Sequence, residues 1–423
     1  MQSLSFRGPL AWLLSLAFVT ASCAIAQSDP QLEEARRILR STPIVDGHND
    51  VPWQYRTRVD NQLDLINFRD TRGLLPKMHT DLVRLEKSGL GGIFWSVYIP
   101  TDWAGPGATR KTLEQIDLVH RLVERYPQRF SLALTADDIE TAFAQGTIAS
   151  LIGMEGGHSI ENSLGALRQL YRAGARYMTL THSSNTDWAD SSTDEPQFNG
   201  LNAFGREVVR EMNRLGMLVD LSHVSPETMH DALDVTTAPV IFSHSSAFEV
   251  TRHPRNVPND VLARVKKNGG LVMVTFVPTF VSEPLRERSE KRQIELRRLQ
   301  NSGARDVDDA MDDWDSMNPL VPAHLTDVAD HIDHVRAEAG IDAVGIGSDY
   351  DGITSVPDGL EDVSKLPYLF AELIRRGYTE EELGKIASGN LMRVLRAAEA
   401  EAARLQKETN PSDALIEDLG SEP

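Results

Sequence analysis

The stretch "GMLVDLSHVSPETMHDALDVTTAPVIFSH" (residues 216–244) contains one copy of the structural unit that recurs along this chain. An apolar run ends at His223, amphipathic helical spacing covers 226–236, and a second apolar run ends at His244. Two buried strands joined by a helix predict a β–α–β unit with parallel strands. Both strands then end on a histidine at the same edge of the sheet.

The same alternation runs through most of the sequence. Helical spacing also appears at 162–174 and 202–216, and both segments close on glycine. Nearly continuous apolarity is typical of parallel strands that are covered on both faces. Eight such runs lie at 43–48, 91–99, 149–156, 176–182, 216–223, 239–244, 270–276 and 343–350. We therefore predict a (β/α)₈ TIM-like barrel, with one further apolar run, 130–135, at its periphery.

Two segments depart from this alternation. Residues 283–322 are highly charged and lack a strand-like run, so we predict a helical insertion between the seventh and eighth strands. This insertion is either a lid over the site or a solvated helical pair with no catalytic part. The acidic, alanine-rich tail at 401–423 is predicted to be partly disordered. Residues 27–400 are then expected to form a single barrel domain.

Residues 1–26 have the features of a secretory signal: Arg7, an apolar core and a small-residue cleavage pattern that ends at Ala26. We therefore expect the mature chain to be exported, either to the periplasm or out of the cell. Cys23 gives the alternative of a lipoprotein anchor, although Thr20 stands where a large aliphatic residue is usual. No later run reaches ~18 apolar residues, so no transmembrane segment is predicted.

Composition and missing motifs exclude several kinds of protein. The 43 Lys and Arg against 62 Asp and Glu give a formal net charge of −19, which argues against nucleic acid or an anionic membrane as partner. The sequence has neither a G-x-S-x-G elbow nor a Walker A loop. Cleavage after Ala26 would remove Cys23, the only cysteine, and leave no cysteine nucleophile. The "GIGSDYDG" segment (345–352) lacks the third glycine of a dinucleotide fingerprint.

Six polar residues stand at the ends of predicted strands: His48, Glu155, His182, His223, His244 and Asp349. In a barrel the C-terminal ends of the strands form one rim, and active sites lie there. We therefore predict that these side chains converge. His158, just after a strand end, is interpreted as a loop or cap residue. Seven histidines on helical or loop segments are expected at the surface: His79, His120, His230, His253, His324, His331 and His334.

The residue types at this rim are those of a metal centre. His48 and Asp50 are two apart, so on an extended backbone both can reach one cation. Glu155 has two oxygens and can hold a second cation about 3.5–4 Å away, the spacing of two-metal hydrolytic sites. His223 and His244 then complete the second coordination sphere. A mixed nitrogen and oxygen set suits zinc, with manganese or cobalt as alternatives.

Two further residues are candidates for handling a substrate. Asp349 ends the last strand, where it can act as a general base or proton shuttle; Asp351 is its rival, and a loop acid capping a turn is the ordinary alternative. Arg255 follows His244 on the same loop, where its planar guanidinium could hold a substrate carboxylate. A surface arginine is the alternative for this position.

Several motifs, in this order, resemble those of the membrane (renal-type) dipeptidases, which are binuclear zinc enzymes of the amidohydrolase superfamily. They are "DGHND", "GMEGGHSI", "YMTLTHSSNTDWADS", "LVDLSHVS", "FSHSSAF", "RNVPNDVL" and "GIGSDYDG", and the resemblance covers roughly residues 42–397. It implies two zinc ions per chain. One is held by His48 and Asp50, the other by His223 and His244, and Glu155 bridges them.

The same resemblance implies how a substrate is handled. His182 stabilises the oxyanion, Arg255 holds the C-terminal carboxylate, and Asp349 transfers protons while a hydroxide shared by the cations attacks the amide. We therefore expect an exported zinc dipeptidase acting on free dipeptides, including L-D dipeptides. The alternatives are hydrolysis of another small amide, lactam or N-acyl amino acid, and a non-catalytic peptide- or metal-binding protein. Homodimer formation is left open.

Overall fold

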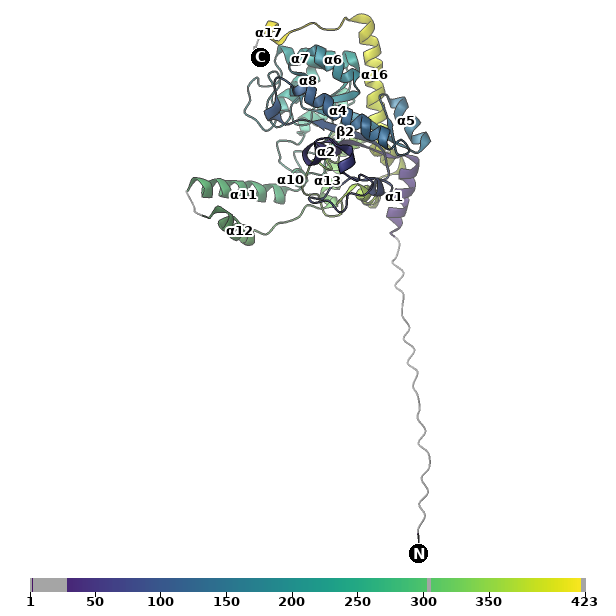
Figure 1. Cartoon of the computed structure of the whole chain (residues 1–423), viewed down its shortest axis with the longest axis vertical. Helices are drawn as coiled ribbons and strands as arrows, with labels where there is room; N and C mark the ends of the chain where they lie inside the picture. Colours follow the sequence, from purple (N-terminus) through teal and green to yellow (C-terminus); the bar gives the residue numbers. More distant parts are fainter. Residues whose placement is uncertain (1, 3–28, 303–305, 420–423) are drawn as a thin grey trace.

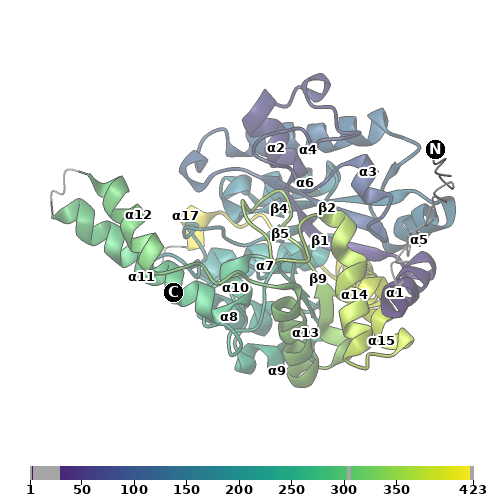
Figure 2. The ribbon, with the colours of Figure 1, turned by 90° about the horizontal axis from the view of Figure 1, so that it is seen from below.

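A closed barrel of eight parallel strands forms the body of the computed structural model, which describes residue 2 and residues 29–302 and 306–419. The strand order around the ring is β2-β1-β9-β8-β7-β6-β5-β4, and pairing of β2 with β4 closes it. The strands are β1 (Ile44–Asn49), β2 (Leu90–Tyr98), β4 (Ile148–Glu155), β5 (Ala175–Thr179), β6 (Leu218–Asp220), β7 (Ile241–Phe242), β8 (Leu271–Val274) and β9 (Val344–Ile346). The predicted (β/α)₈ TIM-like barrel is confirmed, with helices around it (Figures 1 and 2).

The ninth strand lies outside the ring. β3 (Phe130–Leu132) pairs only with the first part of β4, from Ile148 to Ser150. From Ile152 onward, the same edge of β4 pairs with β5 instead. The apolar run at 130–135 is therefore peripheral, as its sequence position predicted.

Helices cover the outside of the barrel. They are α1 (Pro30–Ser41), α2 (Val51–Val59), α3 (Leu82–Leu85), α4 (Ala108–Arg125), α5 (Ala136–Gln145), α6 (Leu164–Arg172), α7 (Ala203–Leu215), α8 (Pro226–Val235), α9 (Asn259–Asn268), α10 (Pro278–Val281), α11 (Glu283–Asn301), α12 (Val307–Met317), α13 (Leu325–Ala339), α14 (Leu366–Arg375), α15 (Glu380–Gly384), α16 (Asn390–Glu408) and α17 (Ile416–Leu419). Most of these helices pack their apolar faces around the barrel, whereas α11 and α12 project away from it (Figures 1 and 2); the strands are buried along most of their length.

Local sequence sets where these helices begin and end. The side chain of Asn202 accepts a hydrogen bond from the backbone of Gly205 and caps α7, which ends at Gly216 with a left-handed φ of 82°. Ser225 caps α8, and Pro226 occupies its first turn, where a missing N–H costs nothing. The Ser225 cap ends the short loop between β6 and α8, which carries His223.

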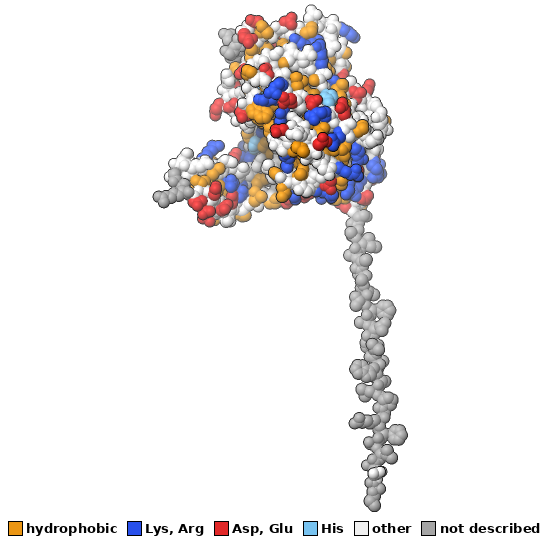
Figure 3. All heavy atoms as spheres, in the orientation of Figure 1, with side chains coloured by type: hydrophobic (Ala, Val, Ile, Leu, Met, Phe, Trp, Pro, Cys, Tyr) orange, Lys and Arg blue, Asp and Glu red, His pale blue; other side chains and the backbone are white. Residues whose placement is uncertain are grey.

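A pair of helices, the α11–α12 arm (283–317), projects from the body between β8 and β9 (Figures 1 and 2). Asp315 of α12 holds Arg288 and Arg292 of α11 at 2.7 and 3.0 Å. Acidic side chains gather over α12 (Figure 3). The highly charged segment is thus helical, while its role as an inserted lid stays a prediction.

The two ends of the chain differ in what the structure describes. The predicted signal segment, 1–26, lies outside the described residues apart from residue 2. At the other end α16 runs to Glu408, and Ser412 donates a hydrogen bond to Glu207 of α7 at 3.1 Å. Within the described ranges, no helix combines the length and apolarity that crossing a membrane would need.

Two histidines that were expected at the surface are buried instead, so that expectation is wrong for His79 and His331. Nδ1 of His331, on α13, accepts a hydrogen bond from the backbone N–H of Ala247 at 2.9 Å, and Nε2 donates to the carbonyl of Val281 at 3.2 Å. The ring therefore links α13 to the loop after β7 and to the end of α10 in its neutral form. Burial lowers the pKa of His331 to about 3.

We expect His331 to make the fold acid-sensitive. Its pKa is lower in the folded chain than the ordinary 6.5, so its contribution is complete above that pH and is lost as the pH falls toward about 3. At about pH 8, His331→Asn should lower the free energy of unfolding by about 1–3 kcal/mol, because a bond and some packing are lost. By about pH 4 the free energy of unfolding of the wild type should have fallen by about 3 kcal/mol, a loss that the variant should not show. Urea unfolding of both proteins measures the difference, and a gap that does not change with pH would contradict this.

Candidate metal centre

A cavity of about 370 Å³ opens at the C-terminal rim of the barrel. Seven of the residues predicted for the site line it: Asp50, Glu155, His182, His223, His244, Arg255 and Asp349. The eighth, His48, is fully buried beside them on β1. The structure therefore brings together side chains from six strand ends and one long loop.

Three donor atoms form one compact triangle. Nε2 of His223 lies 2.9 Å from Nε2 of His244 and 3.1 Å from Oε1 of Glu155, and the third side of the triangle measures 3.5 Å. Ligands of a tetrahedral cation bound at about 2.1 Å stand roughly 3.4 Å apart. The triangle therefore has nearly the size that one such cation requires.

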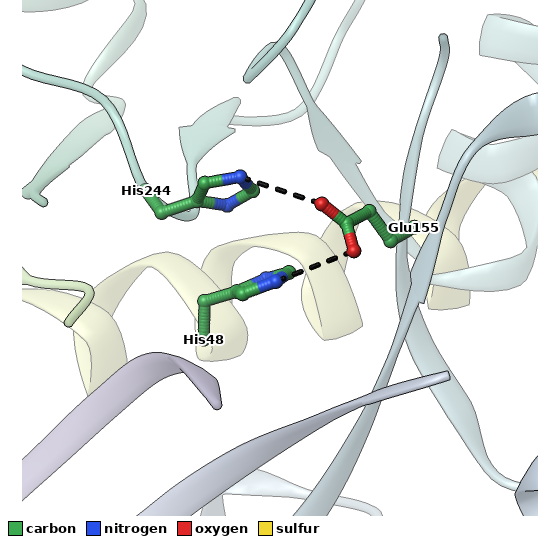
Figure 4. A group of neighbouring side chains, drawn as sticks. All are labelled: His48, Glu155 and His244. Atoms are coloured by element: carbon green, nitrogen blue, oxygen red, sulfur yellow. Dashed lines mark ion pairs between the residues drawn. The ribbon is translucent and has the colours of Figure 1, made fainter. Parts of the chain in front are cut away.

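A second set of donors includes the other oxygen of Glu155. Nε2 of His48 is 3.2 Å from Oδ2 of Asp50 and 3.5 Å from Oε2 of Glu155. Figure 4 shows the Glu155 carboxylate opposite the rings of His48 and His244, with a different oxygen facing each ring. One carboxylate thus faces two donor sets at once.

The donor sets also overlap with two neighbouring residues. Donor atoms within 4.8 Å of one another form three trios: His48, Glu155 and His244; Glu155, His182 and His223; and His48, Asp50 and Asp349. His182 and Asp349 therefore lie at the edges of the same cluster, close enough to contact a molecule bound at its centre.

Hydrogen bonds among these side chains do not satisfy the cluster. Nε2 of His48 is buried without a hydrogen-bond partner within the described part of the chain. Buried polar atoms are rarely left in this state. The Nε2 atoms of His223 and His244 face each other at 2.9 Å, where only one of them can carry a hydrogen. A cation would satisfy all three nitrogens, so these residues fit a metal.

The pKa shifts of the three histidines also fit a metal. Burial lowers the pKa of His223 and of His244 well below the ordinary value, and the positive charge of Arg255 adds to this, so both rings are neutral with free lone pairs. Burial also acts against a charged His48, but Tyr177, Asp50 and Glu155 together raise its pKa well above the usual range. The negative charges of Asp50 and Glu155 therefore favour a positive charge beside His48.

Burial, followed by the nearby charge of Asp50, raises the pKa of Asp349 well above the ordinary range. Asp349 and His223 both have left-handed backbones, with φ of 64° and 72°. Non-glycine residues adopt this conformation at a free-energy cost, and such residues cluster at functional sites. The rival acid, Asp351, points away from the cavity: its Oδ1 accepts from the backbone N–H of His79 at 2.8 Å.

Arg255 is a buried cation, with only 3% of its surface exposed, and it lines the cavity. Among the residues that the structure describes, no carboxylate oxygen lies within 4 Å of its guanidinium. Its contacts are long bonds of 3.4 Å to the hydroxyl of Ser245 and the carbonyl of His244, and its guanidinium carbon lies 5.5 Å from the Phe280 ring centre. A buried charge normally has a partner, so Arg255 has the chemistry of an anion-binding group.

Sequence reasoning missed the apolar wall of this cavity. Trp53, Tyr98, Val277, Phe280 and Ile353 line it together with the charged residues. Trp53 stands only three residues after Asp50, so its place in the same motif was a usable signal, whereas nothing near Phe280 pointed to the site.

His158 lies outside the three donor trios: its Nε2 contacts the carbonyl of Ile99 at 2.9 Å, and burial lowers its pKa to about 4.

Comparison with known proteins places the fold and the cluster in context. A family model described as "Membrane dipeptidase (Peptidase family M19)" matches residues 32–409. The probable dipeptidase PvdM from Pseudomonas aeruginosa superposes with a TM-score of 0.75 at 22% identity, over 88% of this chain and 99% of that one.

Two other solved structures are slightly more similar in sequence. A dipeptidase AC, described as a metallopeptidase of family M19, has 27% identity and a TM-score of 0.67 over 84% of this chain and 98% of its own. A Rhodobacter sphaeroides metallopeptidase, solved with a phosphinate mimic of the dipeptide L-Ala-D-Ala, has 26% identity and a TM-score of 0.68, over 84% of this chain and 99% of its own.

The close packing around Gly352 gives a test of the His48 and Asp50 donor set. A methyl group there would lie 2.3 Å from Oδ2 of Asp50 and 2.5 Å from Oδ1 of Asp349, so both carboxylates would have to move. We expect Gly352→Ala to weaken zinc binding by at least about tenfold, as loss of ligand positioning does elsewhere. Equilibrium dialysis with metal analysis measures it. Gly73→Ala is the matched control, because no atom lies within 4 Å of its added methyl; equal zinc binding by both variants would contradict the prediction.

Proposed function

This chain belongs to the membrane dipeptidase family, peptidase family M19, and on that premise we propose that it is an exported dipeptidase that hydrolyses free dipeptides with two bound zinc ions. The observation that carries the proposal is the buried guanidinium of Arg255, which has no ion-pair partner in the described ranges and shares one cavity with the donor cluster. A cluster that binds metal beside an anion-binding group suits a peptide with a free carboxylate.

His48 and Asp50 would hold one cation, His223 and His244 the other, and Glu155 would give one oxygen to each. The distances within the two donor sets support this division, since each set is closed by a different oxygen of Glu155. Imidazole and carboxylate ligands favour zinc. When bound, such cations supply Lewis-acid polarisation of the scissile carbonyl and lower the pKa of a water molecule.

Arg255 sets where the substrate's C-terminal end binds. Its planar guanidinium can donate two parallel hydrogen bonds to the C-terminal carboxylate, and burial strengthens them. The cavity volume of about 370 Å³ limits what fits between this residue and the donor cluster. A free dipeptide places its only peptide bond one residue from its carboxylate, so the fixed separation selects dipeptides over longer peptides.

His182 and Asp349 would act on the reacting atoms. Nε2 of His182 lies 3.6 Å from Oε1 of Glu155, and Ser183 Oγ, 3.2 Å from Nδ1, can donate to that nitrogen and leave the proton on Nε2. Nε2 then donates to the carbonyl oxygen as negative charge develops there. Asp349, at the edge of the His48 and Asp50 trio, passes a proton to the departing amine.

The proposal extends to dipeptides with a D-residue at the C-terminal position. Its support is the similar metallopeptidase from Rhodobacter sphaeroides, which was solved with a mimic of L-Ala-D-Ala. Export rests on the signal features of residues 1–26, with a lipoprotein anchored through Cys23 as the alternative. N-acyl amino acids also carry a carboxylate next to one amide bond, so they are the competing substrate class.

A small substrate panel tests this function. We expect hydrolysis of L-Ala-L-Ala and L-Ala-D-Ala, and loss of both activities with a chelator until zinc is returned. The amidated dipeptide L-Ala-L-Ala-NH₂ keeps the scissile bond but lacks the carboxylate, so its kcat/KM should fall by about 100-fold or more. Faster cleavage of N-acetyl-alanine than of either dipeptide would favour the competing class instead.

A variant of Arg255 tests the carboxylate contact itself. Arg255→Met should raise KM for L-Ala-L-Ala by about 30–100-fold, because a charged hydrogen-bonded contact contributes about 2–3 kcal/mol. The same variant should cleave the amidated dipeptide as fast as the wild type does, since neither reaction contains the ion pair. Arg252→Met, in the same loop with an exposed side chain, is the matched control. An unchanged KM for Arg255→Met would remove the contact from the mechanism.

A further inference from the structure

Two of the histidines in the cluster have their second ring nitrogen bonded from behind, inside the barrel. We infer that Tyr177 and the Ser243–Asp220 pair are positioning residues that hold the proton of His48 and His244 on Nδ1, so that Nε2 of each ring faces the cluster with its lone pair. The inference rests on the proposed metal centre and adds three residues to it.

Tyr177 acts on His48. Its phenol oxygen lies 2.8 Å from Nδ1 of His48 and 3.2 Å from the carbonyl oxygen of Gly47, which can only accept a hydrogen bond. Because a phenol has one hydrogen to donate, the bond to His48 must run from Nδ1–H to the phenol oxygen. The proton is therefore on Nδ1, and Nε2 is left free beside Asp50 and Glu155.

A glycine in the barrel interior leaves space for the Tyr177 side chain to reach His48. Tyr177 pairs with Gly153 on the neighbouring strand β4, and a methyl group on Gly153 would lie 2.0 Å from Cζ of the tyrosine ring. Glycine at 153 is thus needed for the ring to pass from β5 toward β1. The phenol is fully buried, so no water competes for its bonds.

Ser243 and Asp220 act on His244 in the same way. The hydroxyl of Ser243 donates to Oδ2 of Asp220 at 2.6 Å and lies 2.8 Å from Nδ1 of His244. With its hydrogen on the carboxylate, the serine oxygen can only accept from Nδ1–H. Asp220 also accepts from the backbone N–H of Ser243 at 2.8 Å and from the hydroxyl of Thr179 at 2.5 Å, so its position is fixed.

The third histidine provides a contrast. Nδ1 of His223 is buried and has no hydrogen-bond partner among the described residues. Its ring is instead oriented by a left-handed backbone and by stacking on His182, with ring centres 4.3 Å apart. The hydrogen-bonded supports therefore act once on each donor set: Tyr177 bonds His48 in one set, and Ser243 bonds His244 in the other.

A purely structural role for these polar groups would look different in one measurement. If the bonds only stabilised the barrel, their loss would lower the melting temperature equally with and without metal. If they position the histidines, their loss reduces the stabilisation that zinc adds, because that increment follows metal affinity. Measured zinc affinity also distinguishes Tyr177 from the Ser243–Asp220 pair, because each supports a histidine of a different donor set.

The experiment compares Tyr177→Phe and Ser243→Ala with the wild type, using zinc alone as the probe. Zinc affinity is measured by competition with a chromophoric chelator, and melting temperature is measured in metal-free and zinc-loaded protein. Tyr378→Phe is the matched control, because this buried tyrosine, between α14 and α15, donates to Asp333 of α13 at 2.7 Å and does not line the cavity.

We expect each variant to weaken one of the two zinc affinities by about 10–100-fold, the usual effect of losing the partner of a metal-binding histidine. The metal-free melting temperature should change no more than in Tyr378→Phe. Affinities equal to wild type, or equal losses of melting temperature in both states, would overturn the inference. A wild-type protein that binds no zinc would instead overturn the proposed function, so the two failures are distinguishable.

Discussion

The attraction between one buried carboxylate and the histidines around it organises the whole site. Glu155 is 5% exposed, and its Oε2 faces His48 while its Oε1 faces His223 and His244. Burial raises the pKa of a carboxyl group, yet the nearby imidazoles lower that of Glu155 well below its ordinary value. A charge kept in so dry a place needs a positive partner, and donor atoms at these spacings provide for one.

The barrel makes this arrangement possible because it delivers side chains from separate strands to one rim. Six of the eight barrel strands contribute one or two of these groups at or just past their C-terminal ends, and neighbouring strands lie close enough for those groups to meet. The interior below the rim is not uniformly apolar. Tyr177, Asp220 and Ser243 are fully buried there, and their hydrogen bonds end on the histidines above.

The cavity has a charged side and an apolar side. Arg255 and the donor cluster define the polar ends, while Trp53 and Phe280 supply apolar wall. Phe280 lies on the short helix α10, directly before the α11–α12 arm, and its ring stacks on His253 at 4.1 Å. The base of the arm and the loop that carries Arg255 are therefore packed against each other. This packing holds the guanidinium in place although it has only weak hydrogen bonds of its own.

The sequence by itself determined the barrel and the residues of its rim. Apolar runs of strand length and helical spacing are local properties, so eight strands and helices such as α7 and α8 followed from them, as did the peripheral place of β3. Strand-end histidines could be read from the same pattern because parallel strands share an edge.

Only the tertiary structure decided how those groups face one another. The left-handed backbones of His223 and Asp349, the burial of His331, the orientation of Asp351 toward His79 and the reach of Tyr177 to His48 depend on contacts between distant segments. Local sequence carries no record of such contacts, because side-chain direction and burial are set by which strands become neighbours. The pattern of residues along the sequence identified the candidate donor residues, and the closed barrel set the distances between their donor atoms.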